Sequence, residues 1–233
     1  MNENFYSKKL ICPICKSHFQ TTKIKSEKVK IERKDTDLFR YFKSENPYFY
    51  EINVCPSCGF SYSDNFNQEL DTAAIGKFLK TVSLQWKKQD YTGERNVTHA
   101  IETYKLALLT AQTIDLNENT IASILLRISW LNRLIGNSNE EKRFMKGAVD
   151  FFEKTYSTSM LHSDKSMSSE MMVYLLGELN YRLGQYDESI KWFNIGITKY
   201  ARSPYAKKQT IDMMRNRWMD IKEEMKNQTE QSG

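Results

Sequence analysis

Cys12-Pro13-Ile14-Cys15 and Cys55-Pro56-Ser57-Cys58-Gly59 are the two stretches that decide how this chain of 233 residues folds at its N-terminus. They contain all four of its cysteines. A CxxC turn points both sulfurs at one cation, and the amides of the turn can donate hydrogen bonds to the thiolates. Gly59 can take positive φ without steric cost, whereas Lys16 stands at that place in the first turn. We therefore predict a tetrahedral metal site with Cys12, Cys15, Cys55 and Cys58 as its ligands.

Zinc in a structural role is the ion that this ligand set favours, because four protein thiolates leave no position for water. Rubredoxin-type iron uses the same geometry and is the alternative, although nothing else in the sequence suggests an electron-transfer role. A catalytic dithiol would need a thiolate at a helix start beside a strand-helix-strand unit, and neither turn lies in such a context. His18 could replace one sulfur, but the cysteine set is already complete.

The first ten residues, MNENFYSKKL, have neither the apolar region nor the small-residue cleavage site of a secretion signal. We therefore expect a cytoplasmic protein whose cysteines are not in disulfides. No apolar run is long enough to span a bilayer, so we expect no membrane partner. The formal net charge is +5, and residues 1–60 carry eleven Lys and Arg against seven Asp and Glu, so most of the basic excess lies in the cysteine-bearing segment.

The segment between the cysteine pairs has the pattern of a small β domain. Residues 19–34 (FQTTKIKSEKVKIERK) alternate apolar and charged side chains, which predicts a solvent-edged hairpin. A second extended run is predicted to open at Pro47 and to bring Cys55 to the metal. Residues 1–64 are therefore predicted to form a zinc ribbon, in which metal binding would supply folding free energy on the order of 10 kcal/mol.

From about residue 65 the apolar residues recur at intervals of three and four, which is typical of amphipathic helices. The helices follow one another as antiparallel pairs. The predicted fold class is therefore α+β and mostly α, with the β zinc ribbon followed by a helical array over residues 65–227 and a flexible tail over residues 228–233.

The clearest helix pair resembles a tetratricopeptide repeat. Leu176-Gly177 in its first helix, Gly184-Gln185-Tyr186 at its turn and Phe193 in its second helix stand at that family's offsets. Ser189 and Gly196 depart from it, since both stand where small alanines are usual. Two upstream helix pairs match more weakly.

The last predicted helix carries an apolar stripe that suits a cap on the open end of a helix array. The same stripe could instead be a dimer seam, so the sequence leaves the oligomeric state open. The residues of this stripe are Ile211, Met214, Trp218, Ile221 and Met225.

The chain as a whole resembles the bacterial domain of unknown function 2225 family. The resemblance is carried by residues 12–60: the paired cysteine turns, the Lys-rich stretch between them, the turn DTDLF and the approach NPYFYEINVCP to the second turn. It continues less distinctly into the helices. The resemblance implies a cytoplasmic bacterial protein with this layout, and it brings no activity with it.

The leading functional hypothesis is a protein that binds a partner protein or peptide on the inner face of its helix array. Aromatic residues combined with arginine are typical of such surfaces. The alternative is that Trp130 and Tyr174 are packed core. The candidate partner-binding residues are Trp130, Arg133, Tyr174, Tyr181 and Arg182.

The second hypothesis is nucleic-acid binding through the basic stretch of the ribbon, with Phe39, Tyr41, Phe42, Tyr48, Phe49 and Tyr50 as stacking groups. Against it, Glu27, Glu32, Asp35 and Asp37 interrupt the basic strip, and alternating charge on an exposed strand is usually a solvated face. The candidate contacts are Lys23, Lys25, Lys28, Lys30, Arg33 and Lys34.

An enzyme is the least favoured class. The sequence has no phosphate-binding glycine loop, no HExxH and no nucleophile elbow. Its three histidines are scattered and suggest no general base. We therefore expect no catalytic residues.

Overall fold

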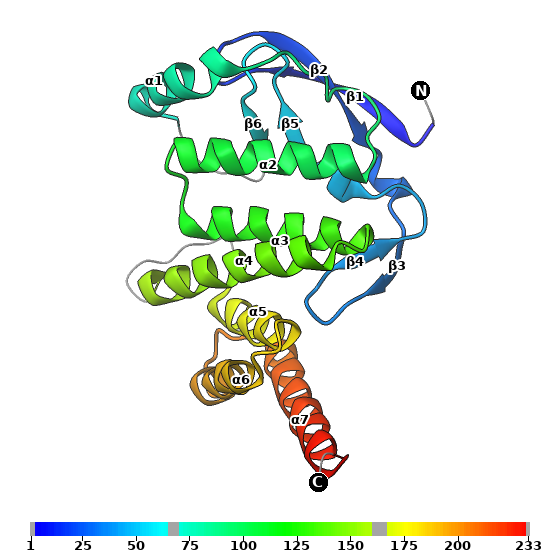
Figure 1. Cartoon of the computed structure of the whole chain (residues 1–233), viewed down its shortest axis with the longest axis vertical. Coiled ribbons are helices and arrows are strands. Elements are labelled where there is room, and N and C mark those ends of the chain that lie inside the picture. Colours follow the sequence, from blue (N-terminus) through cyan, green and yellow to red (C-terminus); the bar gives the residue numbers. More distant parts are fainter. Residues whose placement is uncertain (1–2, 65–69, 160–166, 232–233) are drawn as a thin grey trace. The chain divides into compact units, whose positions relative to one another are not determined.

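Figure 1 shows the computed structural model of the chain, which describes residues 3–64, 70–159 and 167–231. The chain is mostly helical with small antiparallel sheets near the N-terminus, which confirms the predicted α+β class. It divides into two compact units, residues 1–148 and residues 149–233, and the division falls within helix α4 (Ser138–Ser159). The predicted domain boundary between residues 64 and 65 coincides with the start of a gap and lies outside the described residues.

The strands of the first unit form two-stranded antiparallel sheets. β1 (Phe5–Ile11) pairs with β2 (His18–Ile24), and β5 (Ile52–Val54) pairs with β6 (Ser61–Ser63). Each CxxC stretch is therefore the turn of one of these hairpins. Between them, β3 (Ile31–Lys34) pairs with β4 (Arg40–Phe42).

The predicted hairpin over residues 19–34 is wrong. β2 pairs backward with β1 through the first cysteine turn, while β3 pairs forward with β4, so the two halves of the Lys-rich stretch belong to different sheets. The alternation is present in both strands, but alternation does not identify a strand's partner, which the turns decide here. The predicted extended run from Pro47 also differs, because it opens with a 3-10 turn, Pro47–Tyr50, capped by Asn46.

The helices of the first unit are α1 (Thr72–Thr81), α2 (Val97–Thr113) and α3 (Glu118–Leu134). Each begins after an Asp or Asn whose side chain accepts a hydrogen bond from a first-turn amide, as N-caps do. α2 lies between the β5–β6 hairpin and α3 (Figure 1), and it contacts both. The core of this unit is therefore built jointly by the small sheets and the helices.

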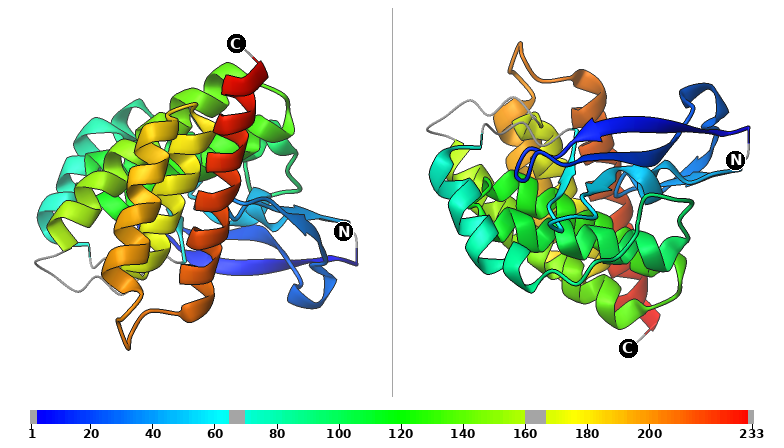
Figure 2. Two further views of the ribbon diagram at one scale, coloured as in Figure 1. Left: turned by 90° about the horizontal axis from the view of Figure 1, so that it is seen from below. Right: turned by 90° about the horizontal axis from the view of Figure 1, so that it is seen from above.

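The second unit contains α5 (Ser169–Arg182), α6 (Tyr186–Tyr200) and α7 (Lys208–Gln231), which run side by side (Figure 2). α5 and α6 approach closely at Gly177, where an added Cβ would lie 2.6 Å from the ring of Phe193. Ile211, Met214 and Ile221 of α7 are buried. This burial fits the predicted capping role of the last helix. α7 continues to Gln231, and residues 232–233 of the predicted tail lie outside the described residues.

Candidate metal centre

The four cysteine sulfurs converge on one point of the first unit. The Sγ atoms lie within 4.8 Å of one another, and the Cys12–Cys58 and Cys15–Cys55 pairs are each separated by 3.6 Å. A tetrahedron with zinc–sulfur bonds of about 2.3 Å has sulfur–sulfur edges of about 3.8 Å, whereas a disulfide bond is about 2.05 Å long. The spacing therefore matches four ligands around one ion, and the four cysteines are all free.

Both cysteine turns have the same backbone geometry. In the first, the amide of Lys16 donates to the carbonyl of Cys12 at 3.0 Å, and the amide of Cys12 donates to the carbonyl of Ser17 at 2.9 Å. In the second, the amide of Gly59 donates to the carbonyl of Cys55 at 2.9 Å. Lys16 has φ of +61° and Gly59 has φ of +77°. The left-handed position that the sequence predicts is thus present in both turns, with a lysine in one of them.

The surroundings make an uncompensated set of thiolates unfavourable. Cys12, Cys55 and Cys58 are at most 2% exposed, and Cys15 is partly exposed. The contact with Cys12 lowers the pKa of Cys55, whereas the contact with Cys55 raises the pKa of Cys12. Neighbouring thiols that oppose each other in this way need a cation before all four can be deprotonated. The donor set therefore fits a soft divalent metal.

The second cysteine turn is packed against the helical part of the same unit. Trp86 Nε1 donates to the carbonyl of Pro56 at 3.0 Å, and its ring covers Gly59. Next in the chain, Phe60 packs edge-to-face on Phe78 of α1 with ring centroids 5.1 Å apart. The helical spacing of the apolar residues predicts Trp86 on the apolar face of the first helix, but α1 ends at Thr81 and Trp86 follows the 3-10 turn Ser83–Gln85.

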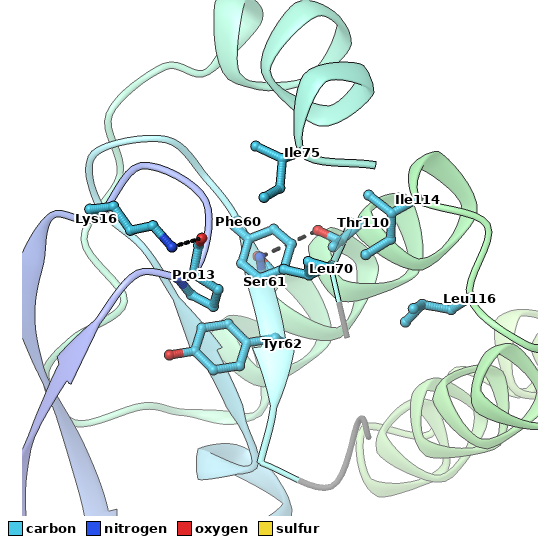
Figure 3. Close-up of a pocket in the computed structure, with 10 residues that line it drawn as sticks. All are labelled: Pro13, Lys16, Phe60, Ser61, Tyr62, Leu70, Ile75, Thr110, Ile114 and Leu116. Atoms are coloured by element: carbon cyan, nitrogen blue, oxygen red, sulfur yellow. Dashed lines mark hydrogen bonds between the residues drawn. The ribbon is translucent and has the colours of Figure 1, made fainter. Parts of the chain in front are cut away.

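A cavity of about 250 Å³ lies beside the first cysteine turn (Figure 3). Pro13 and Lys16 line it on one side, and Lys16 Nζ donates to the carbonyl of Pro13 at 2.9 Å. The other lining residues are Phe60, Ser61, Tyr62, Leu70, Ile75, Thr110, Ile114 and Leu116. These described lining residues combine apolar side chains with the amine of Lys16, the phenol of Tyr62 and two hydroxyls.

The predicted partner-binding residues of α3 are engaged inside the first unit. Trp130 is 4% exposed, and its indole donates to Oδ2 of Asp37 at 3.0 Å. Arg133 contacts Asp37 at 2.7 Å, Asp35 at 2.9 Å and Glu141 at 2.7 Å. Both side chains thus hold the DTDLF turn on α3, so the interpretation of Trp130 as packed core is the correct one.

In the second unit, Tyr174 is 2% exposed and belongs to the core, again as the buried alternative expects. Tyr181 and Arg182, near the end of α5, remain partly exposed. The hydroxyl of Tyr181 donates to Glu224 of α7, and Arg217 lies over its ring at 5.0 Å from the centroid. Of the candidate partner-binding residues, Tyr181 and Arg182 therefore keep accessible surface.

The candidate nucleic-acid contacts are split by the fold. Lys23 is partly buried and donates to the carbonyl of Tyr50 at 2.7 Å, so its ammonium is engaged within the protein. The other five are spread over β3 and the loop that precedes it: Lys25 and Lys28 are partly exposed, and Lys30, Arg33 and Lys34 are exposed. Among the proposed stacking groups, the following three are buried and unavailable to bases: Phe39, Tyr48 and Tyr50.

Arg95 is a structural residue that the sequence analysis missed. It is 6% exposed, and its guanidinium donates to the carbonyls of Phe49, Ile52 and Tyr91. Burial lowers its pKa to about 10. Because these carbonyls lie on separate segments, Arg95 joins the approach to the second cysteine turn to the start of α2.

Comparisons with known proteins bear on the family and on nothing finer. No curated protein and no solved structure gave a significant match. Within the described part of the chain, none of the helices is long and apolar enough to cross a membrane. One family model, described as an uncharacterized protein conserved in bacteria (DUF2225), matches residues 5–221. With its paired cysteine turns and helices in that span, this chain belongs to the DUF2225 family.

Proposed function

We propose that this protein is a non-enzymatic zinc protein, in which a structural Zn²⁺ bound by Cys12, Cys15, Cys55 and Cys58 supports a helical scaffold that binds a partner protein or peptide. The observation that carries the zinc assignment is the convergence of four sulfurs at tetrahedral spacing. When bound, the ion would supply charge compensation and a cross-link between two hairpins.

A structural role follows from the ligand count. Four protein thiolates fill a tetrahedral site, so water and substrate have no position on the ion. Two-stranded hairpins are marginally stable alone, and the two hairpins here are separate sheets. A shared ion joins the β1–β2 turn to the β5–β6 turn, which explains why the ligands come from turns far apart in the sequence.

Metal analysis tests this assignment. The purified protein should contain about one equivalent of zinc, and Cys15→Ser should lose most of it, whereas Ser17→Ala beside it should retain it. If the protein instead contains one equivalent of iron and shows the visible absorption of an iron tetrathiolate, the ion is iron, bound by the same four thiolates. A metal-free protein that is fully folded would contradict the structural role.

The interaction role rests on the second unit. The close approach of α5 and α6 at Gly177 and Phe193 supports the tetratricopeptide-like interpretation, since that repeat packs its two helices through small residues. Tyr181 lies against Arg217 and the ring of Tyr186, and Arg182 follows it in α5. This cluster combines aromatic and arginine side chains of the kind found at binding hot spots. We place the partner-binding surface at this cluster.

A matched pair of double variants tests that surface. Tyr181→Ala with Arg182→Ala should remove a specific co-purifying protein while the melting temperature changes by only a few degrees. The control, Arg202→Ala with Tyr205→Ala, removes the same two residue types from exposed positions of the same unit and should keep the partner. Equal retention by both variants would refute the assignment.

A further inference from the structure

The hairpin of β3 and β4 carries a cluster of exposed cations that the metal centre does not use. We infer that this hairpin, here called the basic ribbon, binds the phosphate backbone of a nucleic acid through Lys30, Lys34, Arg40 and Lys43. All four side chains are exposed. The basic ribbon lies in the first unit, and the proposed protein-binding cluster lies in the second, so this inference is independent of the proposed function.

The pairing of the strands places like charges beside each other. Lys34 is the register partner of Arg40, and the amide of Lys43 donates to the carbonyl of Lys30 at 3.0 Å. The ribbon therefore has one cation pair at each end. Like charges directly opposite each other on a two-stranded sheet are destabilising. Among the described residues no carboxylate forms an ion pair with any of the four.

The aspartates that interrupt the basic strip in the sequence are largely withdrawn from the surface. Asp37 is 0% exposed and Asp35 has 15% of its side chain exposed, because Arg133 binds both. Within residues 30–43, all of which are described, the exposed carboxylate is Glu32, at the bulge in β3. The surface of the ribbon is therefore more positive than its sequence suggests.

Protection of a sheet edge does not explain this arrangement. Lysines that discourage edge pairing act by standing along an edge, and they do not need to face another cation across the ladder. A facing pair instead provides two donors for one anion. Along β4 and its continuation the two pairs are three residues apart, at Arg40 and Lys43, because the bulge at Glu32 adds a residue to β3 only. This interval corresponds to about 10 Å at about 3.3 Å per residue. Successive residues of a strand face opposite sides, so the two pairs lie on opposite faces of the ribbon and each would bind a separate phosphate.

Further features favour nucleic acid over other polyanions. Arg40 presents a planar guanidinium, which matches phosphate geometry better than a point charge does. Beside it, the guanidinium of Arg33 lies 3.3 Å above the ring of Tyr41, a flat stacked surface of the type on which bases stack. A two-stranded β-ribbon is also an element that the major groove admits. The expected ligand is therefore a nucleic acid held without reading its sequence.

Fluorescence anisotropy with labelled 20-nucleotide single-stranded RNA, single-stranded DNA and duplex DNA tests the inference with the zinc-loaded full chain. Lys34→Ala with Arg40→Ala should weaken binding about tenfold, and the quadruple variant that adds Lys30→Ala and Lys43→Ala should weaken it further. The control is Lys87→Ala with Lys88→Ala, which removes two exposed lysines elsewhere in the same unit and should change binding less than twofold. Lys34→Arg with Arg40→Lys should retain binding.

Salt and competitors decide the remaining outcomes. Binding should fall steeply between 50 and 200 mM salt, and the quadruple variant should have a shallower slope because it releases fewer counterions. Equal weakening by the control pair would overturn the inference, since total charge would then be the cause. Polyglutamate or anionic lipid vesicles that bind as tightly as nucleic acid, with the same loss in the quadruple variant, would assign the ribbon to those ligands and overturn the nucleic-acid assignment.

Discussion

The indole ring of Trp86 covers Gly59, the last residue of the second cysteine turn. A Cβ at Gly59 would lie 2.5 Å from Cε3 of Trp86, and the indole N–H of Trp86 donates a hydrogen bond to the carbonyl of Pro56 at 3.0 Å. Gly59 also has φ of +77°. One position thus satisfies two constraints, the backbone geometry of a metal-binding turn and the close packing of that turn on the helical part of the unit.

Gly59→Ala should therefore destabilise the zinc-loaded protein by about 2 kcal/mol, because it adds the cost of a left-handed alanine to a clash with Trp86. Chemical unfolding monitored by circular dichroism measures this. Gly76→Ala is the matched control, since Gly76 lies inside α1 and an added Cβ meets nothing within 4 Å. That change should be neutral or stabilising by up to about 1 kcal/mol. Equal effects at both positions would contradict the role assigned to Gly59.

Lys16→Gly should stabilise the first cysteine turn. Lys16 has φ of +61°, a conformation that costs a non-glycine residue about 1 kcal/mol, partly offset by the greater freedom of glycine in the unfolded chain. The net gain should be about 0.5 kcal/mol in thermal unfolding with zinc bound. Lys80→Gly, at an exposed place in α1, should instead lose about 1 kcal/mol. A loss at Lys16 would mean that its side-chain hydrogen bond to Pro13 outweighs the backbone cost.

Asp37→Ala should be among the most damaging substitutions in the first unit, with a loss of about 3–5 kcal/mol. It leaves Arg133 and the indole of Trp130 without their buried acceptor. Glu140→Ala is the control, because Glu140 pairs with Arg143 at the surface and should cost less than about 1 kcal/mol. If Asp37→Ala leaves stability unchanged, the DTDLF turn does not anchor on α3.

Removal of the metal should loosen the first unit and spare the second. Hydrogen exchange with and without a zinc chelator measures this, and the amides of β1, β2, β5 and β6 should lose protection. Amides of α5 and α6 should change little, because those helices belong to the other compact unit. Uniform loss of protection along the whole chain would show that the two units unfold together.

Stability should rise with pH through the titration of Lys23. Burial lowers its pKa from 10.5 to about 8, so the folded protein releases this proton earlier than the unfolded chain does. Relative to Lys23→Met, the wild type should therefore gain stability from about pH 8 to about pH 10.5 and show a constant difference below that range. Lys9→Met, at an exposed place in β1, controls for the loss of one lysine. A flat difference between the wild type and Lys23→Met would contradict the burial of Lys23.

The candidate metal ligands could be predicted from sequence because a CxxC turn is a local structure. The spacing of the two cysteines, the proline after the first of them and the residue after the second determine how each turn closes. The positive φ of Lys16 also follows from this local geometry, since Lys16 occupies the same place in the first turn that Gly59 occupies in the second. The burial of Ile211, Met214 and Ile221 in α7 was predictable for a related reason, because these residues share one apolar stripe of the helix.

Strand pairing and the surface charge were decided only by the tertiary structure. Alternation in residues 19–34 predicts strands but not partners, so β2 and β3 appeared as one hairpin although each pairs with a different strand. The sequence predicts Trp130 and Arg133 on a binding surface. In the structure both bind the DTDLF turn, which lies more than 90 residues earlier in the chain. The sequence by itself determined the two cysteine turns and the helical stripes, because these depend on neighbours along the chain. Contacts between distant segments decided which charges are buried, and hence that the basic ribbon is exposed, because burial depends on neighbours in space.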